Sequence, residues 1–179
     1  YTFDKNKTAV FAVDTMLTMF KNQISQQMLE DIKNSPYDLK QIITMASIIE
    51  KETDGSDRET IASVIYNRLN NPNASAGTNG YLQIDATLAY LNGGKVPTEA
   101  DKQIDSPYNT YLYPGLPAGP ISNPGIAAIR AALSPEPDEE AKDAYFFVTD
   151  LKGNYYYART LSEHNANCQT AADVNKTVG

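Results

Sequence analysis

The chain has 179 residues and carries 22 acidic side chains against 15 from Lys and Arg, which gives a formal net charge of −7. This length fits a single domain, or one domain with a helical extension. The acidic balance disfavours nucleic acid and anionic membrane surfaces as partners, because binding to either favours a basic face. The single cysteine, Cys168, excludes an intramolecular disulfide and a cysteine-based zinc cluster. Since no carboxylates and histidines have the spacing of metal ligands, we expect neither a metal nor a cofactor.

The first part of the chain is predicted to be helical. Apolar residues recur every three or four positions and predict one long amphipathic helix over 8–34. Asp38 is placed to cap a second helix that runs to about Thr53. A third helix is predicted from the Ser56–Glu59 capping box to the Asn-Pro pair at 71–72.

Short elements and one long loop are predicted for the middle of the chain. A strand is expected over 81–84, followed by a brief helix capped by Asp85 and another capped by Thr98. Residues 105–125 hold five of the ten prolines and three of the ten glycines. A loop of this length inside a compact domain is usually functional.

The last part of the chain is predicted to combine helices with a hairpin. A helix is expected over 124–133, two strands over 144–149 and 154–158, and a final helix from about Leu161. Helices first and a hairpin later point to an α+β fold rather than to an array of βαβ units.

Glu52 is the candidate for acid–base chemistry near the end of the second predicted helix. It follows Ile48 by four residues and Ile49 by three, so a helix places its carboxyl beside an apolar stripe. Poor solvation favours the neutral carboxyl and raises its pKa, as a general acid at neutral pH requires. From the residues alone, the alternative is that this Glu-Lys-Glu run is ordinary solvated surface at a helix end.

Five sequence blocks together resemble one known family, the MltG/YceG-like endolytic murein transglycosylases. Their order and spacing both fit, and the resemblance covers roughly residues 42–165. The blocks are ASIIEKET (46–53), IASVIYNRL (61–69), LQIDATLAY (82–90), DSPYNTYLYPGLPAGPISNPG (105–125) and LSEHN (161–165). The resemblance implies a mainly helical, lysozyme-like α+β catalytic domain with a small antiparallel sheet or hairpin.

The same resemblance implies how the chain is organised and where it acts. The opening YTFDKNKTA is similar to the end of a LysM-like region. Residues 1–36 are therefore expected to be a helical extension from that region, and residues 37–179 the YceG-like core of a single catalytic domain. The start at Tyr1 rather than Met is expected for an excised fragment whose membrane anchor lies upstream. Action at the extracytoplasmic face of the bacterial cell membrane follows from that anchor.

In this family the catalytic acid belongs to an E-x-E pair, which here is Glu50 and Glu52. Glu52 is preferred, because Glu52-Thr53 resembles the Glu-Ser pair of other lysozyme-like transglycosylases, and Glu50 is the alternative acid or a partner. The implied reaction cleaves the β-1,4 bond between N-acetylmuramic acid and N-acetylglucosamine within peptidoglycan strands and leaves a 1,6-anhydro end. One carboxyl acts first as acid and then as base. The expected role is to end the growth of new strands, with cell-wall synthases as partners.

Six polar residues in the matching blocks are expected to contact the substrate. They are Asn67, Gln83, Asp85, Tyr108, Asn109 and Thr110. On a strand, Gln83 and Asp85 would point to one face. The alternatives are a helix-capping role for Asp85 and turn chemistry for Asn109 and Thr110, whereas Tyr111 is expected to pack.

Two other functions are left open by the residues. A muramidase-type hydrolase would need a base or nucleophile, for which Asp85 and Asp105 are the candidates. A non-catalytic peptidoglycan-binding module would not need Glu52 at all. His164 and Cys168 share one predicted helix face, but nothing nearby offers the oxyanion hole that a Cys–His protease requires. His164 is therefore expected to support the fold or to contact the rim of the site.

Overall fold

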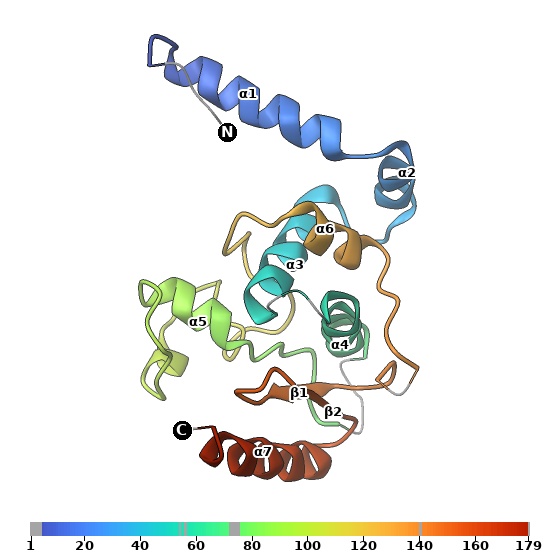
Figure 1. The fold of residues 1–179 in the computed structure, drawn as a ribbon, viewed down its shortest axis with the longest axis vertical. Helices are drawn as coiled ribbons and strands as arrows, with labels where there is room; N and C mark the ends of the chain where they lie inside the picture. The colour runs from blue at the N-terminus through green and yellow to red at the C-terminus, as the bar shows by residue number, and fades with distance from the viewer. Residues whose placement is uncertain (1–4, 54, 56, 72–75, 140, 179) are drawn as a thin grey trace.

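The computed structural model describes residues 5–53, 55, 57–71, 76–139 and 141–178. In this part of the chain, seven α-helices, one short 3-10 helix and one antiparallel hairpin confirm the α+β prediction (Figure 1). In chain order the elements are α1 (Ala9–Gln23), α2 (Gln26–Asn34), α3 (Leu39–Glu52), α4 (Arg58–Asn70), α5 (Asp85–Leu91), η1 (Asp101–Gln103), α6 (Ile126–Leu133), β1 (Phe146–Thr149), β2 (Tyr155–Ala158) and α7 (Leu161–Lys176). None of these helices is long and apolar enough to cross a membrane.

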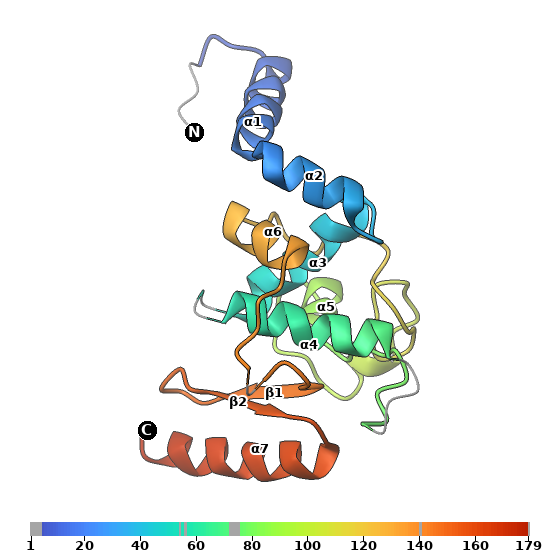
Figure 2. The same ribbon diagram turned by 90° about the vertical axis from the view of Figure 1, so that its right-hand side faces the viewer.

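Helix α3 is the central element of the core, and α4, α5 and α6 all pack against it (Figures 1 and 2). Four large apolar side chains on this helix are completely buried, namely Ile42, Met45, Ile48 and Ile49. Burial of each such side chain contributes roughly 1.5–3 kcal/mol, which outweighs the modest helix propensity of isoleucine. The cap predicted at Asp38 is confirmed and is part of a capping box with Gln41, whose N–H the Asp38 carboxylate accepts at 2.8 Å.

The single helix predicted over 8–34 is wrong, because the chain bends at Ile24 and Ser25 and forms α1 and α2 instead. Ile24 takes an extended conformation, and the Ser25 side chain accepts the Met28 N–H at 3.2 Å as the N-cap of α2. A serine cap satisfies one of the free N–H groups at a helix start, so it competes with an unbroken helix. Helix α1 buries none of its residues and projects from the rest of the protein (Figure 1).

The strand predicted over 81–84 is also wrong, since this segment has an irregular conformation. Gln83 has a φ of 50°, in the left-handed region that a strand does not contain. Two hydrogen bonds to Thr110 hold the segment instead. The Gln83 N–H donates to the Thr110 carbonyl and the Ile84 N–H donates to Thr110 Oγ1, both at 3.1 Å. Residues 105–125, the Pro-rich loop, therefore support this segment through one buried threonine.

The starts of three other helices differ slightly from the prediction. Helix α4 begins at Arg58, and Ser56 of the predicted capping box lies outside the described residues. Helix α6 begins at Ile126, with Gly125 as its N-cap, slightly after the predicted start. The helix predicted after Thr98 is the 3-10 helix η1.

The hairpin and α7 form a layer beside the helical core. β1 and β2 pair antiparallel with Phe146 opposite Ala158 and Thr149 opposite Tyr155, close to the predicted strands. Helix α7 covers one face of the hairpin and α4 lies against the other (Figure 2). Any space between the core and this layer is therefore lined by residues that are far apart in the sequence.

Replacement of Asn109 by Ala is expected to lower the free energy of unfolding by at least about 2 kcal/mol. Asn109 is completely buried, and its Nδ2 donates to the carbonyls of Lys102 and Ile104 at 3.1 and 2.9 Å. Its Oδ1 accepts the Tyr111 N–H at 3.0 Å. Alanine would leave three partly buried backbone groups without these partners, at up to about 1–3 kcal/mol each.

Urea denaturation followed by circular dichroism measures this change. The matched control is Asn165→Ala, which removes an exposed asparagine from α7 and should alter stability by no more than about 0.5 kcal/mol. Equal losses in the two variants would contradict the role given to the buried amide of Asn109.

Candidate active site

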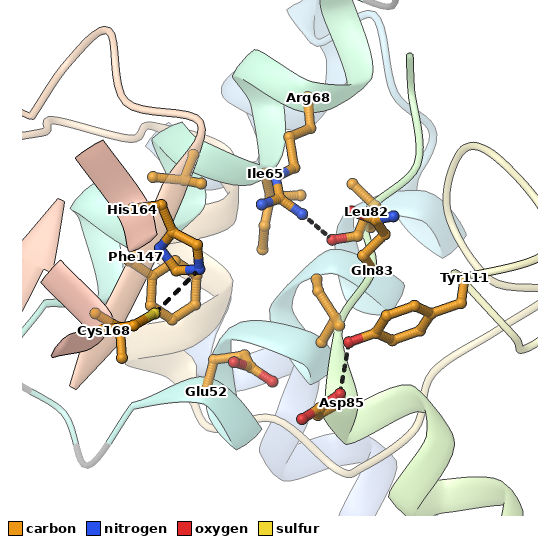
Figure 3. Close-up of a pocket in the computed structure, with 13 residues that line it drawn as sticks. Glu52, Ile65, Arg68, Leu82, Gln83, Asp85, Tyr111, Phe147, His164 and Cys168 are labelled. Carbon is orange, nitrogen blue, oxygen red and sulfur yellow. Dashed lines mark hydrogen bonds between the residues drawn. The ribbon is translucent and has the colours of Figure 1, made fainter. Parts of the chain in front are cut away.

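Glu52 is the last residue of α3, and its side chain faces a cavity of about 270 Å³. The cavity lies where the helical core meets the hairpin and α7, so both contribute to its wall (Figure 3). Its apolar lining includes Ile65, Leu82 and Phe147, and its polar groups include Arg68, Asp85 and His164. The predicted acid thus stands in a hollow with a partly apolar wall.

The carboxyl of Glu52 is largely shielded from water, and this desolvation raises its pKa from 4.5 to about 7. A hydrogen bond from the Ala86 backbone lowers the pKa, the negative charge of Asp85 raises it, and the positive charge of Arg68 lowers it. Desolvation has the largest effect, so Glu52 keeps its proton up to about neutral pH. A carboxyl in this state can act as a general acid.

A second cavity, of about 560 Å³, adjoins the first, and Glu52 and Asp85 line both. Helix α5 and the turn after it form most of its wall, and Tyr90 presents a partly exposed ring there. This ring lies against Tyr108, with 5.0 Å between the ring centroids. Because the candidate acid stands where the two cavities meet, the site has room for a substrate that continues on both sides of it.

Glu50, the alternative acid, makes a different contact. Its Oε2 accepts the Gly125 N–H at 3.2 Å, at the start of α6. It does not line either of the two cavities, whereas Glu52 lines both. The geometry therefore supports Glu52 over Glu50 as the acid.

Gln83 and Asp85 line the same cavity, although they do not lie on a strand. Asp85 is the first residue of α5, but no side chain caps this helix. Its Oδ1 instead accepts the Tyr111 hydroxyl at 2.6 Å, which brings the Pro-rich loop to the cavity (Figure 3). Packing is the favoured sequence prediction for Tyr111, yet this residue lines the cavity, and burial together with this hydrogen bond raises its pKa.

Arg68 is a site residue that the sequence analysis did not identify. Its Nε donates to the Tyr145 carbonyl at 2.5 Å and its Nη1 donates to the Leu82 carbonyl (Figure 3). Burial lowers its pKa to about 10, against the charges of Tyr111 and Glu52, which raise it. A signal for this residue does exist in the sequence, because Arg68 follows buried positions of α4 by three and four residues and so lies on their helix face.

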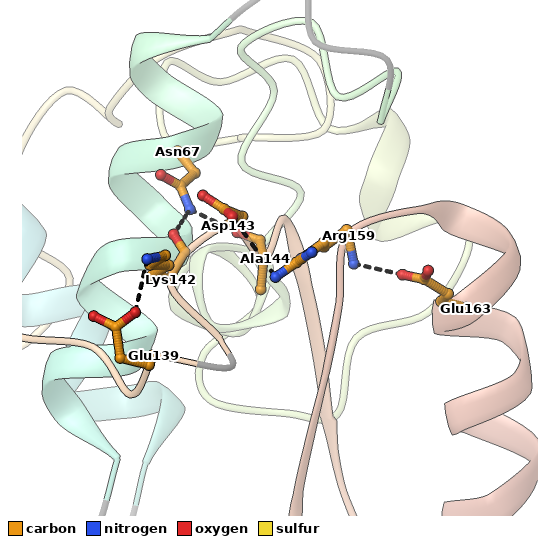
Figure 4. A network of polar contacts seen from close by, with 7 residues as sticks. All are labelled: Asn67, Glu139, Lys142, Asp143, Ala144, Arg159 and Glu163. Atoms are coloured by element: carbon orange, nitrogen blue, oxygen red, sulfur yellow. Dashed lines mark hydrogen bonds and ion pairs between the residues drawn. The ribbon is translucent and has the colours of Figure 1, made fainter.

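The other four expected binding residues do not line the first cavity. Asn109 and Thr110 are buried with their side chains bonded inside the protein, which favours the turn-chemistry alternative for both. Tyr108 is partly buried and supports Tyr90 in the second cavity. Asn67 holds the chain before β1, since its Nδ2 donates to two carbonyl oxygens there, those of Lys142 and Ala144 (Figure 4).

His164 and Cys168 come from α7 and line the first cavity. His164 Nε2 lies 3.6 Å from Cys168 Sγ, and the imidazole stacks on Phe146. Burial lowers the pKa of His164, and the charge of Arg68 lowers it further. Among the described residues, no three His, Cys, Asp or Glu side chains gather as metal ligands would.

Known proteins are similar to this chain over most of its length. The model of the YceG-like family matches residues 1–170. An endolytic murein transglycosylase of Bacillus subtilis (strain 168) is 34% identical over 168 residues, which are 92% of this chain and 44% of that relative. An endolytic murein transglycosylase of Streptococcus pneumoniae serotype 2 (strain D39 / NCTC 7466) is 30% identical over 169 residues, which are 93% of this chain and 30% of that relative.

A solved structure is similar as well. The crystal structure of a YceG-like protein from Listeria monocytogenes is 37% identical in sequence, with a TM-score of 0.79 over 93% of this chain and 52% of that one. This chain therefore spans less than half the length of the curated relatives that it matches. Because the family model and the solved structure both cover nearly the whole chain, the chain belongs to the YceG-like family.

Proposed function

We propose that this chain is the catalytic part of an endolytic murein transglycosylase, an enzyme that cuts the glycan strands of peptidoglycan internally. The observation that carries the proposal is the shielded carboxyl of Glu52 at the junction of two cavities, with its pKa raised to about 7. The names of the two relatives support the same reaction class. The bond cleaved is the β-1,4 bond between N-acetylmuramic acid and N-acetylglucosamine.

One carboxyl accounts for both proton transfers of this reaction. Protonated Glu52 gives its proton to the glycosidic oxygen, and the bond from that oxygen to C1 of the muramic acid breaks. The Glu52 carboxylate then takes the proton from the C6 hydroxyl of the same sugar while that oxygen bonds to C1. The product is a 1,6-anhydro end, no water is consumed, and Glu52 is protonated again. An internal nucleophile of this kind benefits from a high effective concentration.

Positive charge develops at C1 during the reaction, and Asp85 is placed to stabilise it. Its carboxylate lines both cavities beside Glu52, and the Tyr111 hydroxyl holds it at 2.6 Å. A charge that is already held in position needs no reorganisation as the positive charge develops. In this mechanism Asp85 stabilises the transition state and transfers no proton.

The two adjoining cavities support cleavage within a strand rather than at its end. Glu52 lines both, so sugars can extend from the cleaved bond in either direction. A site closed on one side would accept only a strand end.

A muramidase-type hydrolase is the second candidate, and the position of Asp85 is what favours it. A carboxylate beside the acid is able to activate water, as inverting and retaining glycosidases require. Asp105, the other candidate base, does not line either cavity. Its carboxylate accepts the Tyr113 hydroxyl at 2.6 Å within the loop. The mass of the product separates the two reactions, since hydrolysis adds one water that the anhydro product lacks.

The setting of the enzyme is also a proposal. We place its action at the extracytoplasmic face of the bacterial membrane, where peptidoglycan is made, with cell-wall synthases as partners and the ending of strand growth as its role. Residues 1–36 are proposed to be an extension from a LysM-like region, and residues 37–179 the catalytic core.

Replacement of Glu52 by Gln is expected to lower the cleavage of purified peptidoglycan by about 100-fold or more, the usual contribution of general acid–base catalysis. Glu50→Gln is the matched control, because glutamine still offers an oxygen to the Gly125 N–H and Glu50 lies outside both cavities. Digests are compared by mass spectrometry, and wild-type products should carry 1,6-anhydro ends. Full activity in Glu52→Gln would exclude the proposed acid, and hydrated ends would show a hydrolase.

The pH dependence of kcat/KM is expected to fall as pH rises through about 7, because the reaction needs protonated Glu52. Asp85→Asn removes a negative charge that raises the pKa of Glu52, so the fall should move to lower pH in this variant.

Asp105→Asn is the control for this shift, since Asp105 forms the same kind of Tyr–Asp pair at 2.6 Å outside the two cavities. Its pH profile should match that of the wild type. An unchanged profile in Asp85→Asn, or the same shift in both variants, would contradict the proposed electrostatic coupling between Asp85 and Glu52.

A further inference from the structure

Arg68 brings a positive charge into the first cavity, and no acidic side chain of the described residues forms an ion pair with it. Two of its N–H groups are bonded to backbone carbonyls, those of Tyr145 and Leu82. Glu52 interacts with it only through its charge, and in the acid form that starts the reaction Glu52 has no charge. The guanidinium is therefore not neutralised before the substrate binds.

The guanidinium also lies over the ring of Phe146, with 5.0 Å between Cζ and the ring centroid. Neither this ring nor the two backbone carbonyls carries a negative charge, so the positive charge that Arg68 brings into the cavity needs a further physical reason. One reason is that an anion supplied from outside completes the site when it binds. A guanidinium offers five N–H donors in a planar fork that matches a carboxylate. With two donors used by the backbone, further donors are left for such a group in the cavity (Figure 3).

We propose that Arg68 binds a carboxylate of the substrate that is carried on the muramic acid residue, and so assigns this sugar to the first cavity. The inference rests on the proposed function. In a glycan strand, N-acetylglucosamine has no carboxylate, whereas each muramic acid carries one on its lactyl group or on the peptide joined to it. Arg68 would thus set the direction of the strand across Glu52, with N-acetylglucosamine beside Tyr90 in the second cavity.

Binding measurements in a Glu52→Gln background test this inference without cleavage. Isothermal titration calorimetry compares three ligands: glycan fragments that bear peptides, the same fragments after enzymatic removal of the peptides, and oligosaccharides of N-acetylglucosamine alone. Arg68→Met should weaken binding of acidic fragments by about 10- to 100-fold, the range expected for charged hydrogen bonds. Binding of the N-acetylglucosamine oligosaccharides should change less than about twofold.

Two variants serve as controls. Arg130→Met removes an exposed arginine on α6 and should leave the binding of all three ligands unchanged. Arg68→Lys keeps the charge and guards against a folding defect in Arg68→Met, and it should bind acidic fragments better than Arg68→Met does. Circular dichroism establishes that each variant is folded.

The pattern across ligands decides the outcome. Weaker binding of peptide-free fragments identifies the lactyl carboxylate as the group bound, and a loss confined to peptide-bearing fragments identifies a carboxylate of the peptide. An equal loss for all three ligands would overturn the inference and leave Arg68 with a purely structural role. A selective loss in Lys51→Met, at the second cavity, and none in Arg68→Met would overturn it as well. Whether the wild type cleaves strands is measured separately, so failure of the proposed function would be recognised independently.

Discussion

A carboxyl that the hydrophobic core keeps out of water is the feature on which the rest of the site depends. Glu52 follows Ile48 and Ile49 by one helical turn, and both isoleucines are completely buried. Charging a carboxyl whose pKa is raised from 4.5 to about 7 costs on the order of 3 kcal/mol, since one pKa unit is about 1.4 kcal/mol. Burial of the two isoleucines contributes roughly 3–6 kcal/mol. A movement that exposed them in order to hydrate Glu52 would therefore be unfavourable. The core therefore maintains the protonated acid.

The wall opposite this acid is built by buried polar groups rather than by a sheet. Thr110 accepts the Ile84 N–H through its hydroxyl and the Gln83 N–H through its carbonyl, both at 3.1 Å. Asn109 holds the same loop from inside, with three hydrogen bonds from its amide group. These contacts explain how a loop rich in proline and glycine keeps Tyr111 in place beside the cavity. Asn109 and Thr110 thus position the residues of the cavity without lining it themselves.

Two charges of opposite sign flank the acid and have different tasks in the proposed reaction. Asp85 raises the pKa of Glu52, and in the proposal its carboxylate stabilises the positive charge that develops at C1. Arg68 lowers the same pKa and offers its free donors to an anionic group of the substrate. Tyr111 holds the negative charge in place, because its hydroxyl donates to Asp85 at 2.6 Å. The proposed reaction thus takes its acid, its stabilising charge and the group that orients the substrate from one cavity.

The resemblance to a known family made Glu52 the leading candidate acid. The sequence by itself determined most helices with a strong apolar period, the hairpin, the α+β class, and the position of Glu52 beside an apolar stripe. These features follow from local spacing, since a residue three or four positions after a buried one shares its helix face. Only the tertiary structure decided that Ser25 divides the first predicted helix, that Gln83 leaves the strand conformation, and that Arg68 lines the cavity. The first two depend on competition between a cap and a continuing helix or on partners far along the chain, and neither leaves a periodic signal. The spacing in α4 places Arg68 on the buried helix face, but the cavity that it lines is formed together with residues from other parts of the chain. The contacts of Thr110 with Ile84 and Thr87, and the pairing of Tyr111 with Asp85, became visible for the same reason, because contacts across 23 to 26 residues are made by the folded chain and not by its local pattern.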